Sequence, residues 1–592
     1  MCTQVSPSIG DLTNLKRLHL SGNPGLERLP PGAGKLKLLE SCSLANCPMR
    51  GPPPEVVAEG AKVLVDYQAR LLEAETSGQL NLDGFALLSS GRDKLDPNVL
   101  GFTGLASLSL NANRLNMLEP QIGVALTGLT ELYVRSNFLR ELPLEVSRLE
   151  RLCVLQLDEN ELRELAPWVR MLTALADLSL AQNQLEYLTE AIGELPRLRK
   201  LNLASNKLLA VPPELARVSC MVSLNLDNNP LRSPPREVVA KGHGLVMDYL
   251  RRLHVSMTSN SLQLVSMGLE QLPVEAQIYS ALTSIDCGDN LISELGKSVG
   301  NHPSLQHLLL AHNRIERVHP NVRHLHRLQR LHLPFNQLSA LPETVAELRE
   351  LQVLNLVENR FETVGEHICQ ITSLTDLRVS HNKVGELHRS IGQLHRLRRL
   401  NLECNALATL PDEVGGMSAL THLNLNTNEL EALPETFWHL TLLEALDVSA
   451  NRLGMLPTGL GKCGSLAAFA FADNPFGSIP KEVVEAGAAT LIDYLARFFR
   501  AGPPPGCEKL PGAWEGKSKS LDLEGFHLQE VPTPALARLP CCLPAVPAVC
   551  VCLRCVCLVC LPDINVCLSA STTVCLTHRC RPTCSAWRTW RR

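Results

Sequence analysis

The stretch LQHLLLAHNRIERV, residues 305–318, decides the fold of this chain. Leu308 and Leu310 are two residues apart, which is the spacing of one face of a β-strand. Asn313 follows, and the next apolar positions come at wider spacing, which indicates a turn and then a short helical or extended return segment. One unit of this size cannot bury its own apolar residues, so we expect several copies to stack and share a core.

The pattern L-x-x-L-x-L-x-x-N-x-L recurs along the chain, and its Asn gives the register. In one series every Asn follows the one before it at the same distance in sequence, and chance does not produce such a constant step. The members of this series are Asn290, Asn313, Asn336, Asn359, Asn382, Asn405, Asn428, Asn451 and Asn474. A second series consists of Asn113, Asn137, Asn160, Asn183, Asn206 and Asn229. Its first step is longer by one residue, and all its later steps are the same as in the first series. We expect each Asn to hydrogen-bond the backbone of the turn after its strand, so that the side chains form a ladder.

This pattern resembles the leucine-rich repeat, and the resemblance covers nearly all of residues 5–532. The 23-residue form, with Leu-Pro in the return segment as at Leu341-Pro342, is similar to the intracellular Shoc, Ras-suppressor and plant Ras-group-related type. The resemblance implies an α/β fold, a leucine-rich repeat solenoid curved as a horseshoe with parallel strands on its concave face. It also implies a non-enzymatic scaffold or adaptor that binds proteins in signal transduction, with small GTPases or their regulators as partners.

Three segments that interrupt the repeat share one pattern, which we call the closing motif. It consists of Glu-Val-Val, a glycine five residues after the Glu, and Asp-Tyr eleven and twelve residues after it, starting from Glu55, Glu237 and Glu482. Apolar residues at steps of three and four predict an amphipathic helix in each segment. We interpret these helices as caps or joints between arrays, since the ends of a solenoid need covering; a docking helix is the alternative. The motif is similar to that of cytosolic leucine-rich-repeat-containing proteins with more than one array.

The interruptions divide the chain into predicted parts. Residues 1–72 are expected to form a partial array with a closing helix, and residues 78–255 and 260–500 two further arrays, each with its own closing helix. Residues 519–539 begin another array that stops early, and residues 540–592 form a Cys-rich tail. The first residues fit the second half of a repeat, so we expect a chain that begins in mid-repeat.

The tail holds 11 of the 21 cysteines, and its origin stays open. One hypothesis is that it is translated non-coding sequence and not native to the protein; disorder is also compatible with its composition. The others are a palmitoylated or membrane-associated tail, a metal site at the spacing of Cys552, Cys555, Cys557 and Cys560, and disulfides.

Composition excludes several classes of protein. With 45 % apolar and 20 % charged residues, the chain of 592 residues is not disordered by composition. A net charge of −4 argues against a nucleic-acid-binding surface. No secretory signal is visible at the start, and no apolar run long enough to span a membrane occurs through residue 540. We therefore expect a cytoplasmic protein, whose oligomeric state the sequence leaves open.

Partner-binding residues are predicted on the strand face that points away from the buried leucines, because side chains alternate along a strand. Counted back from each Asn, they are at positions −6, −4, −2 and −1. In the second array the predicted residues are mainly acidic: Glu131, Tyr133, Arg135, Asp158 and Asp177. In the third they carry His and Arg: His307, Arg330, His332, Asn355, Asp376, Arg378, Arg399, Asn401, His422 and Asn424. The difference in charge predicts two different partners, or one partner that contacts both arrays.

We predict no catalytic residue, cofactor site or metal site, and therefore no enzyme. The row Glu358, His381 and Cys404 could bring a nucleophile beside a base, but an exposed ladder offers neither a pocket nor an oxyanion site. His307, His312 and His332 are close enough in register for metal binding to be considered, and we do not favour it. The alternative function is that of a regulatory repeat region in a larger GTPase or kinase.

Overall fold

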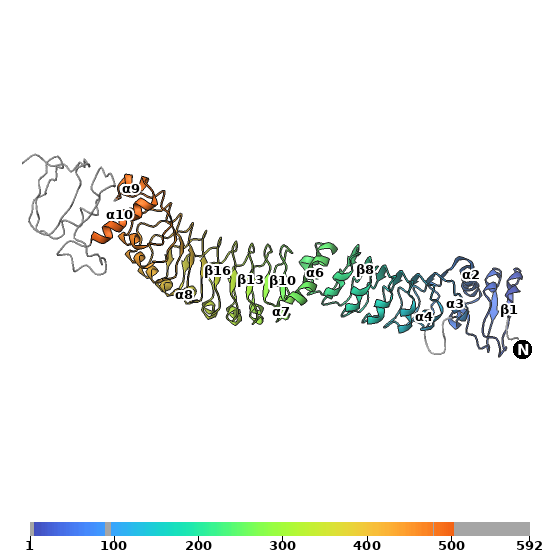
Figure 1. Ribbon diagram of the computed structural model, residues 1–592. Helices are drawn as coiled ribbons and strands as arrows, with labels where there is room; N and C mark the ends of the chain where they lie inside the picture. The colour runs from blue at the N-terminus through green and yellow to red at the C-terminus, as the bar shows by residue number, and fades with distance from the viewer. Residues whose placement is uncertain (1–4, 89–95, 478, 502–592) are drawn as a thin grey trace, which may run out of the picture. The chain divides into compact units, whose positions relative to one another are not determined.

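The computed structural model describes residues 5–88, 96–477 and 479–501. It divides into two compact units, Met1–Ile278 and Tyr279–Arg592, which we call unit 1 and unit 2. Each unit is a stack of short coils (Figure 1), and a coil has a three-residue strand, a turn at the Asn and a short return helix. The predicted α/β solenoid with parallel strands is confirmed.

The main sheet of unit 1 has seven parallel strands in chain order. Leu155 is paired with Leu178, the residue at the same position of the next repeat, so each coil advances the register by one full repeat. The strands are β3 (Gln79–Asn81), β4 (Ser107–Ser109), β5 (Glu131–Tyr133), β6 (Val154–Gln156), β7 (Asp177–Ser179), β8 (Lys200–Asn202) and β9 (Ser223–Asn225). Two earlier strands, β1 (Arg17–His19) and β2 (Ser41–Ser43), form a sheet of their own, and β10 (Ser261–Gln263) follows the second closing motif.

In unit 2 each strand of the main sheet also pairs in parallel with the corresponding strand of the following coil. Leu331 is opposite Leu354, which again gives a step of one repeat. These strands are β11 (Ser284–Asp286), β13 (His307–Leu309), β15 (Arg330–His332), β16 (Val353–Asn355), β18 (Asp376–Arg378), β20 (Arg399–Asn401), β21 (His422–Asn424), β22 (Ala445–Asp447) and β23 (Ala468–Ala470). Two short pairs occur in the return segments: β12 (Glu294–Leu295) with β14 (Arg317–Val318), and β17 (Thr363–Val364) with β19 (Glu386–Leu387).

The return segments are mostly single turns of 3₁₀ helix, labelled η. In unit 1 they are η1 (Pro7–Asp11), η2 (Pro31–Lys35), α3 (Pro97–Leu100), α4 (Gln121–Ala125), η3 (Leu144–Arg148), η4 (Pro167–Met171), η5 (Glu190–Glu194), η6 (Pro213–Arg217) and α7 (Glu275–Ile278). In unit 2 they are η7 (Lys297–Asn301), η8 (Pro320–His324), η9 (Glu343–Glu347), α8 (Glu366–Cys369), η10 (Arg389–Gln393), η11 (Asp412–Gly416), η12 (Glu435–His439) and η13 (Thr458–Lys462). Proline at or just before the first helical residue suits these starts, because its missing N–H would have no partner there.

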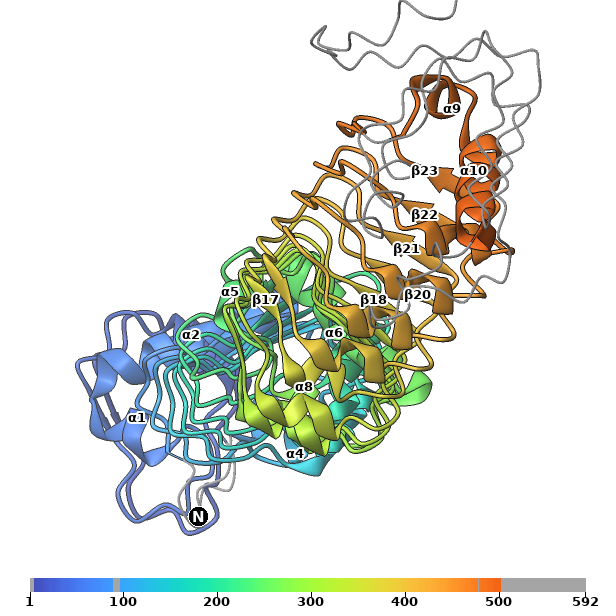
Figure 2. The ribbon, with the colours of Figure 1, turned by 90° about the vertical axis from the view of Figure 1, so that its left-hand side faces the viewer.

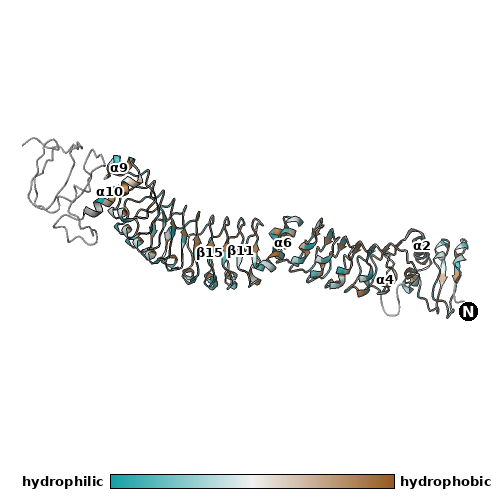
Figure 3. Ribbon diagram, viewed as in Figure 1, coloured by the Kyte–Doolittle hydropathy of each residue, from teal (hydrophilic) through white to brown (hydrophobic). Residues whose placement is uncertain are grey.

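The core is a set of leucine columns that run through the coils. Leu331 and Leu333 are fully buried, at positions −5 and −3, while the strand residues between and before them face outward. Figure 3 shows hydrophobic and hydrophilic residues interspersed along the coils of both units. Burial of each such leucine contributes about 2 kcal/mol to folding, and this is the main stabilising term of the stack.

The predicted Asn ladder is present and joins neighbouring coils. The Nδ2 group of Asn336 donates to the carbonyls of Leu333 at 3.1 Å, in its own turn, and of Leu310 at 2.9 Å, in the preceding coil. Its Oδ1 accepts the N–H of Ile315, also in the preceding coil, at 2.9 Å. Asn160 and Asn451 repeat this bonding. The ladder therefore fixes both the turn and the register between coils.

The closing motifs form the expected helices. They are α1 (Pro54–Ala58) with α2 (Ala61–Ser77), α5 (Arg236–Val239) with α6 (His243–Ser259), and α9 (Lys481–Glu485) with α10 (Ala488–Ala501). The constant place of the glycine has a geometric reason, since Gly60 and Gly242 have φ angles of 102° and 95° between the two helices. Each long helix packs on the last return helix before it, and α10 also contacts β23 (Figure 2).

Two of the closing helices are also bonded to the residues that follow them. The buried Tyr67 hydroxyl donates to Asp96 Oδ2 at 3.3 Å, and that of Tyr249 donates to Glu275 Oε2 at 2.7 Å. Glu55 accepts the N–H of Leu88 at 2.7 Å, which ties the start of the motif to the same region. These contacts support the interpretation of α2 and α6 as joints rather than as free docking helices.

Some sequence predictions lie outside the described residues. They are the restart at 519–539 and the Cys-rich tail at 540–592, so both stay predictions, as does the division into arrays. Within the residues that the structure describes, none of the helices combines the length and the apolar character needed to cross a membrane.

Replacement of Asn336 by alanine should weaken unit 2. The change leaves the buried Ile315 N–H without its partner and the Leu310 carbonyl with Asn313 as its remaining donor, so we expect a loss of about 1–3 kcal/mol in the opening free energy of the surrounding coils. Urea-dependent hydrogen exchange of peptides around residue 336 measures it. Asn301→Ala, at an exposed residue, is the control, and equal effects of both changes would contradict the ladder's role.

The joint at α2 should respond to pH through Asp96. Burial raises the pKa of Asp96 to about 6, against about 4 in an unfolded chain, although hydrogen bonds from Asn98 and Tyr67 oppose the shift. The folded state therefore binds the proton of Asp96 more tightly than the unfolded chain does. The stabilisation that the bound proton gives is complete below about pH 4 and is lost as the pH rises through about 6.

Asp96→Asn should remove that dependence. Like the protonated acid, the variant keeps one acceptor for the Asn98 N–H and has a donor that faces the Tyr67 hydroxyl, but it carries no charge. At pH 7 the opening free energy of α2 should therefore exceed that of the unmodified protein by roughly 1–2 kcal/mol, and at pH 4 the two should agree. Hydrogen exchange of α2, corrected for its intrinsic pH dependence, gives both values. Asp11→Asn, at an exposed residue, is the control; a constant difference across this pH range would rule out titration of Asp96.

Candidate protein-binding surfaces

The outward side chains of the unit 2 strands form rows, which we call the unit 2 strand face. In the row at −6, His307, Arg330, Val353, Asp376, Arg399 and His422 follow one another on consecutive strands. In the row at −4 the order is Leu309, His332, Asn355, Arg378, Asn401 and Asn424. All ten residues predicted for the third array therefore lie on one sheet, with neighbours about 4.8 Å apart.

Positive charge gathers at one part of this face. Arg330 is exposed and lies between His307 and Val353 in its row, with Arg378 two strands away. Burial lowers the pKa of His307 and His332 below the usual 6.5, and the charge of Arg330 lowers both further. Both imidazoles are therefore neutral at physiological pH, so arginine supplies the permanent charge.

The arginines of the face differ in their partners. Arg378 forms a two-pronged contact with Asp376, with Nε to Oδ1 at 3.0 Å and Nη2 to Oδ2 at 2.7 Å. This pair raises the pKa of Arg378, and it occupies the carboxylate of Asp376, which is only 8 % exposed. Among the described residues, Arg330 and Arg399 take part in no ion pair, so their charges are available to a partner.

The asparagines of the face are held by the backbone. Asn355, Asn401 and Asn424 each accept, through Oδ1, an N–H two residues further on, at 3.1, 3.0 and 3.0 Å. Each side chain is thereby fixed with its acceptor in use, and its Nδ2 donors remain for other contacts. Asn424 already donates to Glu403 Oε2 at 3.1 Å. The face as a whole thus offers donors and positive charge.

The predicted acidic face of unit 1 is less acidic than its sequence suggests. Asp158 is only 4 % exposed, pairs with Arg135 Nε at 3.0 Å and accepts the hydroxyl of Ser179. Asp177 lies 3.5 Å from Lys200 Nζ. The expected contrast in charge between the two faces is therefore reduced by pairs within unit 1. Glu131 and Tyr133 are half-buried, and the Tyr133 hydroxyl donates to Glu131 at 3.3 Å.

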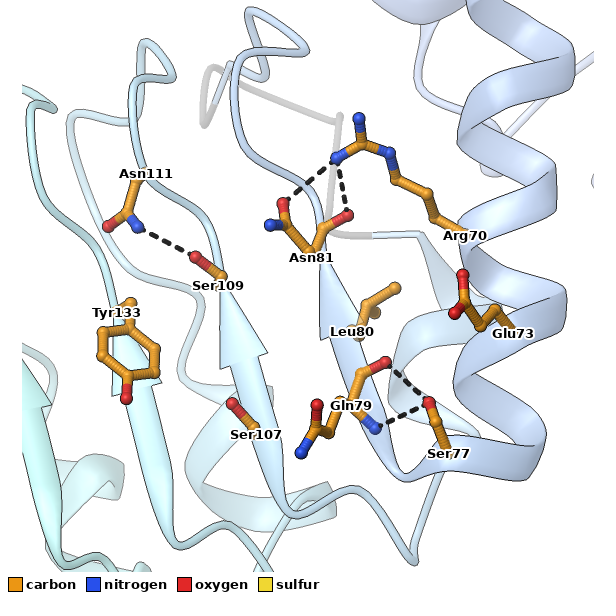
Figure 4. Close-up of a pocket in the computed structure, with 10 residues that line it drawn as sticks. All are labelled: Arg70, Glu73, Ser77, Gln79, Leu80, Asn81, Ser107, Ser109, Asn111 and Tyr133. Carbon is orange, nitrogen blue, oxygen red and sulfur yellow. Dashed lines mark hydrogen bonds between the residues drawn. The ribbon is translucent and has the colours of Figure 1, made fainter.

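Unit 1 also has a hollow of about 440 Å³ between α2 and the strands β3, β4 and β5 (Figure 4). Tyr133 is the one predicted binding residue that lines it. Arg70 reaches from α2 toward the strands, and its Nη1 donates to the carbonyl and the Oδ1 of Asn81 at 3.2 and 3.1 Å. The other lining residues are Glu73, Ser77, Gln79, Leu80, Ser107, Ser109 and Asn111. Its walls are mainly polar, which suits a polar segment of a partner.

Arg70 was not among the predicted site residues, although the sequence contains a signal for it. An arginine follows the Asp of the closing motif by four residues in all three copies, and the pairs Asp66–Arg70, Asp248–Arg252 and Asp493–Arg497 are 3.2, 3.0 and 2.9 Å apart. Arg252 also donates to the carbonyl of Gln263 in β10, at 3.4 Å, as Arg70 does to Asn81 in β3. The repeated Asp-Tyr-x-x-Arg thus marks the residue that joins each helix in unit 1 to the next strand.

Known proteins with related sequences share the repeat. Residues 150–208, 326–384 and 395–453 match the leucine rich repeat family. A stretch of 72 residues, 12 % of this chain, is 39 % identical to leucine-rich repeat serine/threonine-protein kinase 1 of Mus musculus. It covers only 4 % of the length of that protein.

Solved structures that match this chain include a leucine-rich repeat protein of Leptospira interrogans. It is 25 % identical, with a TM-score of 0.26, over 76 % of this chain and 88 % of that one. The ectodomain of the receptor kinase GASSHO1/SCHENGEN3 from Arabidopsis thaliana, solved with Casparian Strip Integrity Factor 2, is 26 % identical. The match covers 80 % of this chain and 52 % of that one, with a TM-score of 0.36.

Proposed function

Because the chain is a leucine-rich repeat protein, we propose that it is a non-enzymatic scaffold that binds acidic segments of partner proteins on the unit 2 strand face. The observation that carries this is the pair of exposed arginines, Arg330 and Arg399, which have no ion-pair partner among the described residues. Arginine forms two-pronged hydrogen bonds with carboxylates, so it favours acidic side chains over neutral ones.

The surroundings of these arginines favour a protein partner over a nucleic acid. Asp376 interrupts the row between Arg330 and Arg399, and the whole chain carries a net charge of −4. A phosphate backbone would need a longer positive track than this. A protein segment with acidic residues spaced to meet single arginines fits better, and the fixed Asn355 and Asn401 would donate to its carbonyls.

The cellular setting that we propose is intracellular signalling in the cytoplasm, with small GTPases or their regulators as the partners. The support for this is the resemblance of the repeat to the Shoc and Ras-suppressor type. Unit 1 would contribute a second contact through the polar hollow beside Arg70 and Tyr133.

A capture experiment with the full chain tests the strand face. The double variant Arg330→Glu, Arg399→Glu should lose its specific partners, with affinities reduced at least tenfold, because two attractive contacts with carboxylates become repulsive. The control is Arg323→Glu, Arg349→Glu, which makes the same charge change at exposed residues of the return segments. Quantitative mass spectrometry compares the captured proteins, and surface plasmon resonance measures the affinity of each.

The outcome depends on the difference between the two variants. Partners lost with the strand-face variant and kept with the control support the proposal, and their binding should also weaken with added salt. Equal retention by both variants, or equal loss from both, would show that the unit 2 strand face is not the binding surface.

A second candidate function is that of a regulatory repeat region of a larger GTPase or kinase. The similarity to the mouse repeat kinase favours this candidate, since the name of that protein says that it contains both leucine-rich repeats and a kinase. Sequencing of full-length transcripts across both ends decides between the two: in-frame catalytic exons at either end would establish the larger protein, and a stop codon soon after residue 532 without catalytic exons upstream would exclude it.

A further inference from the structure

Three side chains with metal-binding atoms meet on two consecutive coils of unit 2. They are His381, Glu403 and Cys404, whose ligand atoms all lie within 4.8 Å of one another. We propose that these residues bind a divalent transition-metal ion of the Zn²⁺ class. The cluster differs from the row Glu358, His381 and Cys404 that the repeat spacing indicates, because Glu403, next to Cys404, supplies the carboxylate.

The ladder explains why these side chains come together. His381 and Cys404 directly precede the ladder residues Asn382 and Asn405, and they have φ angles of 55° and 53°. The His381 N–H donates to the carbonyl of Glu403 at 2.8 Å, which holds the two turns against each other. Two residues in the same backbone conformation on adjacent coils direct their side chains the same way, so the cluster is organised by the backbone itself.

The chemistry of the three groups suits zinc better than calcium or magnesium. Thiolate and imidazole are ligands that Zn²⁺ prefers, whereas the harder cations take oxygen ligands. A thiolate and a carboxylate together balance the charge of the ion. Metal–ligand bonds of about 2.0–2.3 Å would require the three ligand atoms to move about 1 Å closer to one another than they are here. Rotation of the side chains can provide this movement.

Two neighbouring residues are placed to orient the ligands. Glu358 Oε1 lies 3.8 Å from His381 Nδ1, just beyond hydrogen-bond distance, and a small rotation would let it accept the Nδ1 proton and leave Nε2 for the metal. Asn424 Nδ2 donates to Glu403 Oε2 at 3.1 Å and leaves the other carboxylate oxygen for coordination. The His381 side chain is 44 % exposed, so water completes a tetrahedral site from the solvent side.

Alkylation kinetics of the full chain test the site, because each cysteine is followed on its own peptide by mass spectrometry. After chelator treatment, added Zn²⁺ should slow iodoacetamide modification of Cys404 at least tenfold, since a coordinated thiolate reacts slowly. His381→Ala should abolish the protection, and Glu403→Gln should weaken it. His312→Ala, which changes a histidine in the same place on another coil, should retain it.

The assay contains its own controls. Cys220, a partly buried thiol in unit 1, should react at the same rate with and without Zn²⁺, and the fully buried Cys287 should stay unreactive in every folded variant. If Cys287 becomes reactive in His381→Ala, the milder His381→Gln replaces it. Equal alkylation of Cys404 with and without Zn²⁺, or full protection in a folded His381 variant, would overturn the proposal. No partner protein enters the test, so its result is independent of the proposed function.

Discussion

The hydrogen bonds of the ladder Asn are the interaction on which the other features of both units depend. One side chain such as Asn336 satisfies backbone groups of its own turn and of the coil before it, so turn and register are set together. Leucine burial supplies more stabilisation, but it is not directional and a shift by two residues would still keep the leucines inside. The ladder selects one register, and the aligned rows of the unit 2 strand face follow from that choice.

We interpret the closing helices as joints, which would continue a stack whose ends are otherwise exposed. In unit 1 the helix α2 packs on the return helix η2 and is bonded, through Arg70 and Tyr67, to residues after it. Tyr67 and Asp96 are buried, which is tolerated because each is the partner of the other, whereas the bonds of Arg70 lie at the surface. The polar hollow beside Arg70 is a product of the same arrangement, since a helix there stands beside the first strands.

The sequence was sufficient to predict the coil, the Asn ladder and the closing helices, because all three depend on spacing along the chain. It also predicted which residues face outward, since strand side chains alternate. It could not predict which outward residues pair with each other. The carboxylates of Asp158 and Asp376 are occupied by Arg135 and Arg378, and no periodicity encodes such a pair.

The same limit applies to the clusters that were missed. Glu403 stands beside His381 because of the side-chain directions at two turns, which a row taken at one fixed repeat position does not include. Arg70, by contrast, was within reach of the sequence, because its spacing from Asp66 recurs in every closing motif.

The Asn ladder also affects how the unit 2 strand face can change through mutation. Its inter-coil bonds end on main-chain atoms, as those of Asn336 do on the Leu310 carbonyl and the Ile315 N–H. The residues at −6 take no part in this bonding, so substitution there leaves the frame intact, whereas the asparagines at −4 also hold one N–H of their own turn. A new binding specificity can arise through substitutions that cost little stability, and whole coils can be gained or lost one repeat at a time. The frame and the recognition surface are thus separable for mutation, although they share the same short strands.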